Sequence, residues 1–233
     1  MIQLFDLASK YPEVRFSPFC WRIKYALAHK GLSWEEIPIY FSEIDQLPVP
    51  NDGKVPVLVD GSEVVIDSWD IALFLDKKYP QHALFDSDES RSQSLFVKCW
   101  TETVLHSLVS RMGILDFFGL QKDADQKYFR ESREIRFGIT LEEWGGNPEA
   151  ARIGFIKALE PLRQTLSRQN FLGGKGPNFS DYIMVGIFQW LRCGSGLTIF
   201  DKADDVYAYQ ERLLDLFDGL GRSAPAYPKE NHG

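Results

Sequence analysis

The sequence predicts an α+β protein of two domains, with a mixed strand-and-helix unit over residues 1–80 and an all-helical bundle over residues 88–233. Up to Pro80, short strand-like segments alternate with helical ones. Beyond Pro80, nearly every periodic stretch has helical spacing. A chain of 233 residues is long enough for both units to bury a core. We therefore place the domain boundary in the polar segment 81–89.

Local signals place the elements of the first unit. Gly31 is a helix stop signal, and Asp60-Gly61 between two apolar runs is a hairpin turn signal. We expect a strand over 2–6, a helix over 18–30, a strand over 34–39, a hairpin of strands 57–59 and 63–66, and a helix over 68–78.

Capping residues place the helices of the second unit. Ser87 and Ser90 are candidate N-caps of a long first helix. Asn147 is an N-cap followed by a proline at the first helical position, which is a common helix start. We expect helices from this first cap to about Met112, over 147–167, over 178–191, and from Asp201 or Asp204 to Gly219.

Composition and charge exclude several classes of partner and cofactor. The formal net charge is −7 and no block of basic residues is present, which argues against a nucleic-acid partner. No apolar run approaches the ~20 residues that span a bilayer, and the N-terminus does not have the pattern of a signal peptide. The three cysteines are scattered, without a CxxC pair or a Cys/His cluster. We expect no metal, no membrane span and a reducing, cytoplasmic location.

The first candidate site is Ser17-Pro18, at the start of the first predicted helix. A purely structural explanation exists, because serine is a good N-cap and proline suits the first helical turn. The same geometry also serves a function. A helix N-terminus favours an anion, and a hydroxyl group there can lower the pKa of a thiol.

Two further motifs have the same double interpretation. Val55-Pro56 precedes a strand and is a candidate cis bond that would present the Val55 backbone to a peptide, although a trans proline is more common at such a position. Asp67-Ser68 stands where a strand turns into a helix. These two residues either cap that helix or bind the ammonium and carboxylate groups of a ligand.

Taken together and in this order, the three motifs resemble those of the glutathione transferases, and the resemblance covers the whole chain. Asn178 and Asp181 resemble the capping box of a buried helix that is a folding landmark in that superfamily. The resemblance implies a thioredoxin-like N-terminal domain, an all-helical C-terminal domain and a homodimer. Five segments resemble one subgroup of the family, the bacterial lignin β-etherases and the etherase-related fungal transferases. These segments are 25–31, 64–69, 75–80, 172–182 and 217–222.

The chain departs from the etherases in two places. It lacks their longer tail after Arg222, and Cys20 stands inside the active-site turn.

The resemblance also implies roles for individual residues. Ser17 would hydrogen-bond the sulfur of glutathione, whose thiolate attacks a small hydrophobic or aromatic electrophile without a metal. The remaining contacts to glutathione would come from Lys54 for the glycyl carboxylate, the backbone at Val55 and Pro56 for the cysteinyl unit, and Asp67 and Ser68 for the γ-glutamyl end.

The second-substrate pocket should be lined by the helical domain, although aromatic residues at helical spacing more often belong to a core. The candidates are Phe19, Trp100, His106, Met112, Phe117 and Phe118. Among them, His106 is either a general acid for a departing phenolate or a packed or solvated histidine.

Two other functions stay open. Cys20 could form a mixed disulfide with glutathione, which would make the protein a glutathionyl-conjugate reductase. A buried cysteine that packs as a small apolar residue is the more common case. The second alternative is a non-catalytic protein of the same fold that binds hydrophobic ligands.

Overall fold

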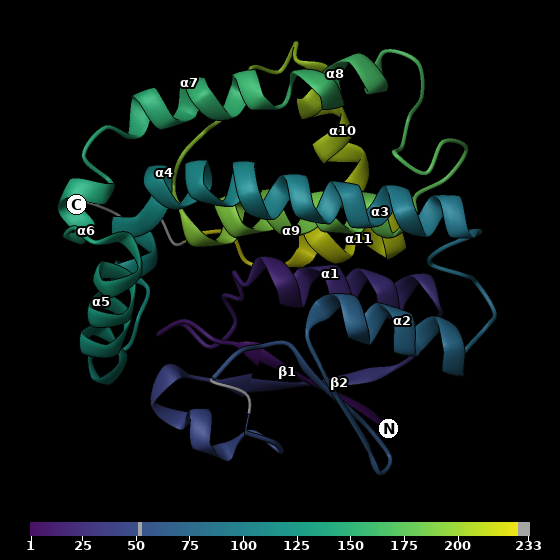
Figure 1. Cartoon of the computed structure of the whole chain (residues 1–233), viewed down its shortest axis with the longest axis horizontal. Helices are drawn as coiled ribbons and strands as arrows, with labels where there is room; N and C mark the ends of the chain where they lie inside the picture. The colour runs from purple at the N-terminus through teal and green to yellow at the C-terminus, as the bar shows by residue number, and fades with distance from the viewer. Residues whose placement is uncertain (51–52, 228–233) are drawn as a thin grey trace.

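The computed structural model describes residues 1–50 and 53–227, and its first part is the mixed unit that the sequence predicts. The strand order in the four-stranded sheet is β2-β1-β3-β4, with β1 parallel to β2 and antiparallel to β3. Helices α1 and α2 lie between this sheet and the helical part of the chain (Figure 1). The elements are β1 (Ile2–Leu7), α1 (Pro18–His29), β2 (Trp34–Ile39), the 3-10 helix η1 (Phe41–Gln46), β3 (Val57–Asp60), β4 (Glu63–Ile66) and α2 (Ser68–Lys78).

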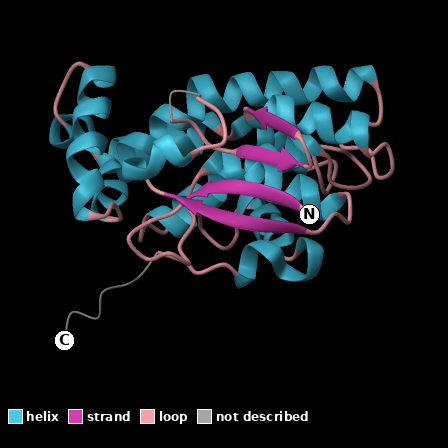
Figure 2. Ribbon diagram, turned by 90° about the horizontal axis from the view of Figure 1, so that it is seen from below, coloured by secondary structure: helices cyan, strands magenta, loops and turns pink. Residues whose placement is uncertain are grey.

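The second part consists of helices, with α9 at its centre. Figure 1 shows α7 and α8 in the layer farthest from the sheet, and the view from below in Figure 2 shows the strands in front of most helices. Residues 228–233 of the predicted domain lie outside the described residues. The elements are α3 (Asp88–Trp100), the π-helical turn η2 (Thr101–Leu105), α4 (His106–Gly119), α5 (Asp123–Phe137), α6 (Leu141–Trp144), α7 (Pro148–Ala158), α8 (Glu160–Leu166), α9 (Phe179–Gly194), α10 (Asp205–Leu214) and α11 (Leu216–Ser223).

Before α7, the observed helices differ from the predicted ones in two respects. The first predicted helix does not end near Met112, because η2 continues α3 into α4, which runs to Gly119. Helices α5 and α6 occupy a stretch where the sequence predicted none. Only Asp125 and Phe129 of α5 are buried, and charged residues dominate this helix, so the sequence offers few apolar residues to reveal it.

Two other predicted helices are interrupted. The helix expected over 147–167 breaks at Leu159, next to Pro161, which has no N–H to donate within a helix. The last predicted helix ends at Leu214 instead of Gly219. Residues 217–219 all have positive φ, between 53° and 75°, and a right-handed helix cannot pass through them.

A buried ion pair attaches α1 to the sheet. The side chain of Asp6 on β1 is fully buried, and its Oδ2 lies 2.7 Å from Lys24 Nζ of α1. The same ammonium group lies 2.8 Å from Glu36 Oε2 on β2 and over the ring of Trp21. Removing one partner of such a pair leaves an uncompensated buried charge, so the pair restricts where α1 can lie on the sheet.

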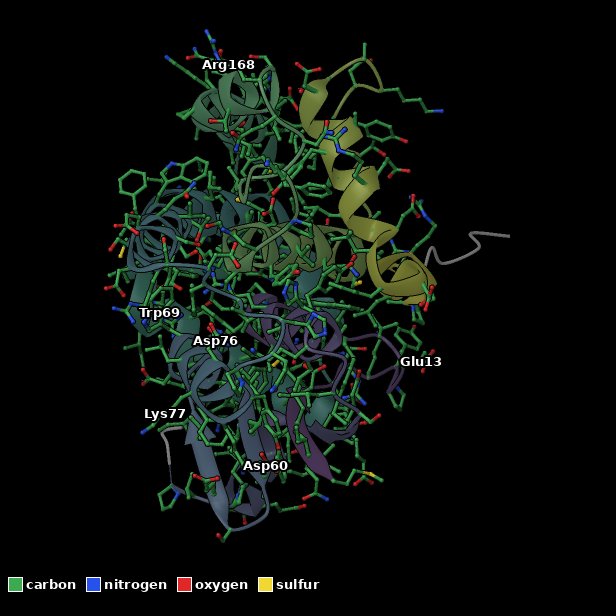
Figure 3. All side chains as sticks on the ribbon, turned by 90° about the vertical axis from the view of Figure 1, so that its right-hand side faces the viewer. Glu13, Asp60, Trp69, Asp76, Lys77 and Arg168 are labelled. Atoms are coloured by element: carbon green, nitrogen blue, oxygen red, sulfur yellow. The ribbon has the colours of Figure 1, made fainter. Side chains whose placement is uncertain are left out.

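The segment between α2 and α3 is held by Lys30 and Asp76. Lys30 Nζ lies 2.6 Å from Asp76 Oδ1, and the Asp76 carboxylate accepts hydrogen bonds from the backbone N–H groups of Leu84 and Phe85. The ring of Trp69 on α2 packs against Phe85, with 5.3 Å between the ring centroids. Figure 3 labels Trp69 and Asp76. Both contacts connect α2 to the start of the helical part.

The capping box at the start of α9 is confirmed. Asp181 accepts hydrogen bonds from the backbone N–H groups of Asn178, Leu172 and Gly173. Its Oδ1 also accepts one from the hydroxyl of Tyr209, at 2.7 Å. One buried carboxylate therefore joins the start of α9 to the preceding loop and to α10.

Two glycines allow α9 to approach its neighbours closely. A Cβ atom on Gly186 would lie 2.3 Å from the carbonyl oxygen of Pro18, in the first turn of α1. A Cβ atom on Gly194 would lie 2.6 Å from the ring of Phe117 on α4. Helix α9 therefore packs directly against the turn that carries Ser17.

We expect Gly186→Ala to lower the free energy of unfolding by about 1–3 kcal/mol, because the added methyl group meets backbone that must move. Urea denaturation measures this change. The matched control is Gly119→Ala, since a Cβ atom on Gly119 meets nothing within 4 Å. If both variants unfold at the same urea concentration as the wild type, the close approach of α9 to α1 does not contribute to the free energy of unfolding.

Candidate functional site

Ser17 is the N-cap of α1. Its side chain is 5% exposed, and its Oγ accepts a hydrogen bond from the backbone N–H of Cys20 at 3.4 Å. Pro18 occupies the first helical position, as the sequence predicts. Because the Ser17 oxygen acts as the acceptor, its O–H hydrogen remains available to a ligand at the positive end of the helix dipole.

The loop before β3 contains the expected cis bond, between Val55 and Pro56. Within residues 1–50 and 53–227, neither the backbone N–H nor the C=O of Val55 makes a hydrogen bond. An extended peptide can pair with such a backbone as an added strand. Lys54 is exposed beside it.

Asp67 and Ser68 divide the two roles that the sequence left open. Asp67 is the cap, since its Oδ1 accepts a hydrogen bond from the N–H of Trp69 at 2.8 Å. It has φ +69°, which costs a non-glycine residue on the order of 1–3 kcal/mol and is often found at binding sites. The Ser68 hydroxyl is buried and has no hydrogen-bond partner among the described residues. A buried hydroxyl without a partner is unusual, so Ser68 is a candidate ligand donor.

Arg22 lies between this motif and the helical domain. Its guanidinium group is fully buried, lies 2.7 Å from Glu102 Oε1 and stacks over the ring of Phe19. Burial lowers the pKa of Arg22, whereas Glu102 and Asp67 act in the opposite direction. The negative charge of Asp67 therefore acts electrostatically on the guanidinium group that stacks over Phe19.

Aromatic rings form an arc that begins and ends beside Ser17. From Phe19 the arc passes to His106 (5.2 Å between centroids), Trp190 (5.2 Å), Phe117 (5.0 Å) and Phe16 (6.1 Å). Phe16 and Phe117 are buried, whereas Phe19, His106 and Trp190 are partly exposed. The three partly exposed rings are the surface that the arc can offer to a second substrate.

The other predicted pocket residues are placed differently. Phe117 is only 1% exposed and supports Trp190 from behind. Met112 is buried, and Phe118 packs against Phe129 of α5. Trp100 is half-buried at the end of α3, and no ring contact in the described part of the chain joins it to the arc.

Trp190 is a residue of the arc that the sequence alone did not single out. The signal was its spacing on α9, where Gly186, Trp190 and Gly194 follow at intervals of four and therefore share one helix face. This spacing could be interpreted only once the structure showed that this face of α9 packs against α1 and α4.

The structure also changes the expected chemistry of two side chains. Burial, followed by the charge of Arg22, lowers the pKa of His106 to about 3, so the ring is neutral near pH 7 and is not the general acid considered above. Burial, followed by Asp6, raises the pKa of Cys20 well above its usual value, against a smaller lowering by Ser17. Cys20 therefore remains a thiol, which is a poor nucleophile.

No metal site and no membrane span are found in the described residues. Within residues 1–50 and 53–227, no three His, Cys, Asp or Glu side chains are grouped so that they could hold a metal ion. No helix in the same ranges is both long and apolar enough to cross a bilayer.

Known proteins match both parts of the chain. The family models described as the N-terminal and C-terminal domains of glutathione S-transferase match residues 12–83 and 92–203. A zeta-class glutathione S-transferase from Euphorbia esula is 28% identical over 127 residues, which are 52% of this chain and 56% of that protein. The match thus spans about half the length of this relative.

Solved structures share the whole fold. A glutathione transferase from Phanerochaete chrysosporium is 21% identical with a TM-score of 0.79, covering 91% of this chain and 95% of its own. A glutathione S-transferase of Ceriporiopsis subvermispora, solved in complex with glutathione, is 21% identical with a TM-score of 0.76, covering 96% and 98%. With the two family models placed in order along one chain, this protein belongs to the glutathione S-transferase superfamily.

Proposed function

We propose that this protein is a glutathione transferase that acts on small hydrophobic or aromatic electrophiles. The observation that carries the proposal is the buried Ser68 hydroxyl at the start of α2, which lacks a partner in the described residues. A hydroxyl and free N–H groups at a helix start suit the carboxylate of a γ-glutamyl group. Asp67 uses Oδ1 as the helix cap, so Oδ2 is available for the ammonium group.

The remaining contacts follow from the same geometry. The Val55 backbone would pair with the cysteinyl unit, and exposed Lys54 would reach the glycyl carboxylate. Ser17 would then donate its hydroxyl hydrogen to the sulfur, at the N-terminus of α1. A hydrogen bond and a helix dipole both favour the thiolate over the thiol, so both lower the pKa of glutathione.

The reaction needs no metal or further cofactor. The thiolate sulfur forms a bond to the electrophilic carbon, and either a leaving group departs with its electron pair or a π bond shifts its electrons to a neighbouring atom. The partly exposed rings of Phe19, His106 and Trp190 supply an aromatic surface for the electrophile. The protein contributes position and deprotonation.

The finer proposal is cleavage of β-aryl ethers that carry a ketone on the neighbouring carbon. The sulfur would form the new bond to the ether carbon, the C–O bond would break, and a phenolate would leave and take a proton from water. The support for this acceptor is the resemblance of five chain segments to lignin etherases and their fungal relatives, together with the aromatic arc.

We expect Ser17→Ala to lower kcat/KM at least tenfold, which corresponds to about 1.4 kcal/mol of transition-state stabilisation. The assay measures glutathione-dependent release of a fluorescent phenol from an α-keto β-aryl ether. Ser62→Ala in the exposed hairpin turn is the control and should keep wild-type activity.

Each other outcome has a distinct meaning. Turnover of a general electrophile without phenol release would discard the etherase and keep the transferase. An unchanged Ser17→Ala variant would exclude the serine from thiolate stabilisation. No retention on immobilised glutathione, together with no turnover of any acceptor, would favour the non-catalytic alternative.

The reductase alternative makes a different prediction, because it needs a reactive Cys20. Burial raises the pKa of Cys20, and it raises that of Cys193 to about 11, whereas Cys99 is exposed. We expect iodoacetamide at pH 8 to modify Cys99 alone in the folded protein and all three cysteines in guanidinium chloride, as measured by peptide mass spectrometry. Rapid modification of Cys20 in the folded protein would instead support the reductase alternative.

We also propose that the protein is a homodimer in a reducing compartment such as the cytoplasm. Three free cysteines support the compartment. Exposed apolar side chains on both units support the dimer, because a subunit interface would remove them from water. They are Val64 and Ile66 on β4 and Leu95, Phe96 and Val104 on α3 and η2.

We expect Phe96→Glu to convert the dimer to a monomer in sedimentation-velocity experiments, because a charge would be buried at the centre of an apolar contact. Phe96 is 71% exposed. Ile135 on α5 is 83% exposed and lies outside this set, so Ile135→Glu is the matched control and should leave the dimer intact. Dissociation by both variants, or by neither, would count against this surface.

A further inference from the structure

His106 occupies the middle of the accessible part of the aromatic arc. Its ring lies between Phe19 of α1 and Trp190 of α9, at 5.2 Å from each. It follows the π-helical turn η2, and such turns are common at functional sites. The hydrogen bonds of this imidazole therefore affect what the partly exposed part of the arc can bind.

Arg22 determines which ring nitrogen carries the proton. Arg22 Nη2 lies 3.5 Å from His106 Nε2, while Nη1 is taken by Glu102. A guanidinium group can only donate hydrogen bonds, so Nε2 must be the acceptor. A neutral imidazole that accepts at Nε2 carries its hydrogen on Nδ1.

The ring is neutral because of its surroundings. Burial and the positive charges of Arg22 and Lys98 disfavour the imidazolium form, and Glu102 only partly opposes them. His106 Nδ1 makes no hydrogen bond within residues 1–50 and 53–227, and this nitrogen atom is not wholly buried. The Nδ1–H group is thus a donor without a protein acceptor beside two aromatic rings.

We propose that His106 Nδ1–H donates a hydrogen bond to a carbonyl oxygen of the second substrate, and that the site therefore favours carbonyl-bearing aromatic acceptors. This inference rests on the proposed transferase function. With an aryl enone, the sulfur bonds to the β-carbon, the π electrons move to oxygen, and the resulting enolate takes a proton from water. A fixed donor stabilises the negative charge that develops on that oxygen.

Two acceptors separate this role from a structural one. Benzylideneacetone carries a carbonyl group, and benzyl chloride has a similar ring without one. We expect His106→Phe to lower the ratio of kcat/KM for benzylideneacetone to kcat/KM for benzyl chloride at least tenfold, while KM for glutathione changes less than twofold. His106→Asn keeps an N–H donor near the Nδ1 position and should recover most of the ketone activity.

The other outcomes overturn the inference in recognisable ways. Equal losses on both acceptors would make His106 a purely structural residue, and no loss on either would remove it from the site. Wild-type protein inactive on both acceptors would reject the transferase function and this inference with it. Independently of activity, nitrogen-15 NMR of the unliganded protein should show the hydrogen on Nδ1, and a hydrogen on Nε2 would contradict the proposal.

Discussion

The close approach of α9 to the first turn of α1 is the constraint on which the candidate site depends. Gly186 leaves no side chain between the two helices, so α9 lies against the carbonyl of Pro18. One turn later on the same face, Trp190 reaches His106 of α4. Because Ser17 caps α1, this contact places the proposed sulfur donor and the proposed acceptor surface relative to each other. The geometry between them is thus a property of helix packing and does not depend on a flexible loop.

Buried charges hold α1 on both of its sides. The Asp6–Lys24 pair joins it to the sheet, and the Arg22–Glu102 pair joins it to the helical domain. Breaking a fully buried pair such as Asp6–Lys24 typically costs about 3–5 kcal/mol. The Glu102 carboxylate is partly exposed, so the Arg22–Glu102 pair is the weaker of the two restraints on rotation or sliding of the helix. Helix α1 is therefore restricted from opposite directions, and the hydroxyl at its start can be held in one position.

The two halves of the site are built by different means. The proposed glutathione half uses mainly backbone features: a cis bond before β3, a positive φ at Asp67, and the starts of α1 and α2. The proposed acceptor half uses the side chains of Phe19, His106 and Trp190, which come from three different helices. Backbone features can be kept through many substitutions, whereas a ring contact changes with one. Relatives that share the first half can thus differ in the second.

The sequence by itself determined the strands, the motif residues and the helix starts at Ser17, Ser87, Asn147 and Asn178, because turns and caps are local interactions encoded by a few neighbouring residues. It did not determine that α5 is a helix, since charged residues dominate that helix and few apolar ones mark it, or that Phe117 is buried. It also could not show that Trp190 meets His106 or that Arg22 lies against one ring nitrogen of this histidine. These facts depend on helices that are far apart in the chain, and only tertiary packing brings them together.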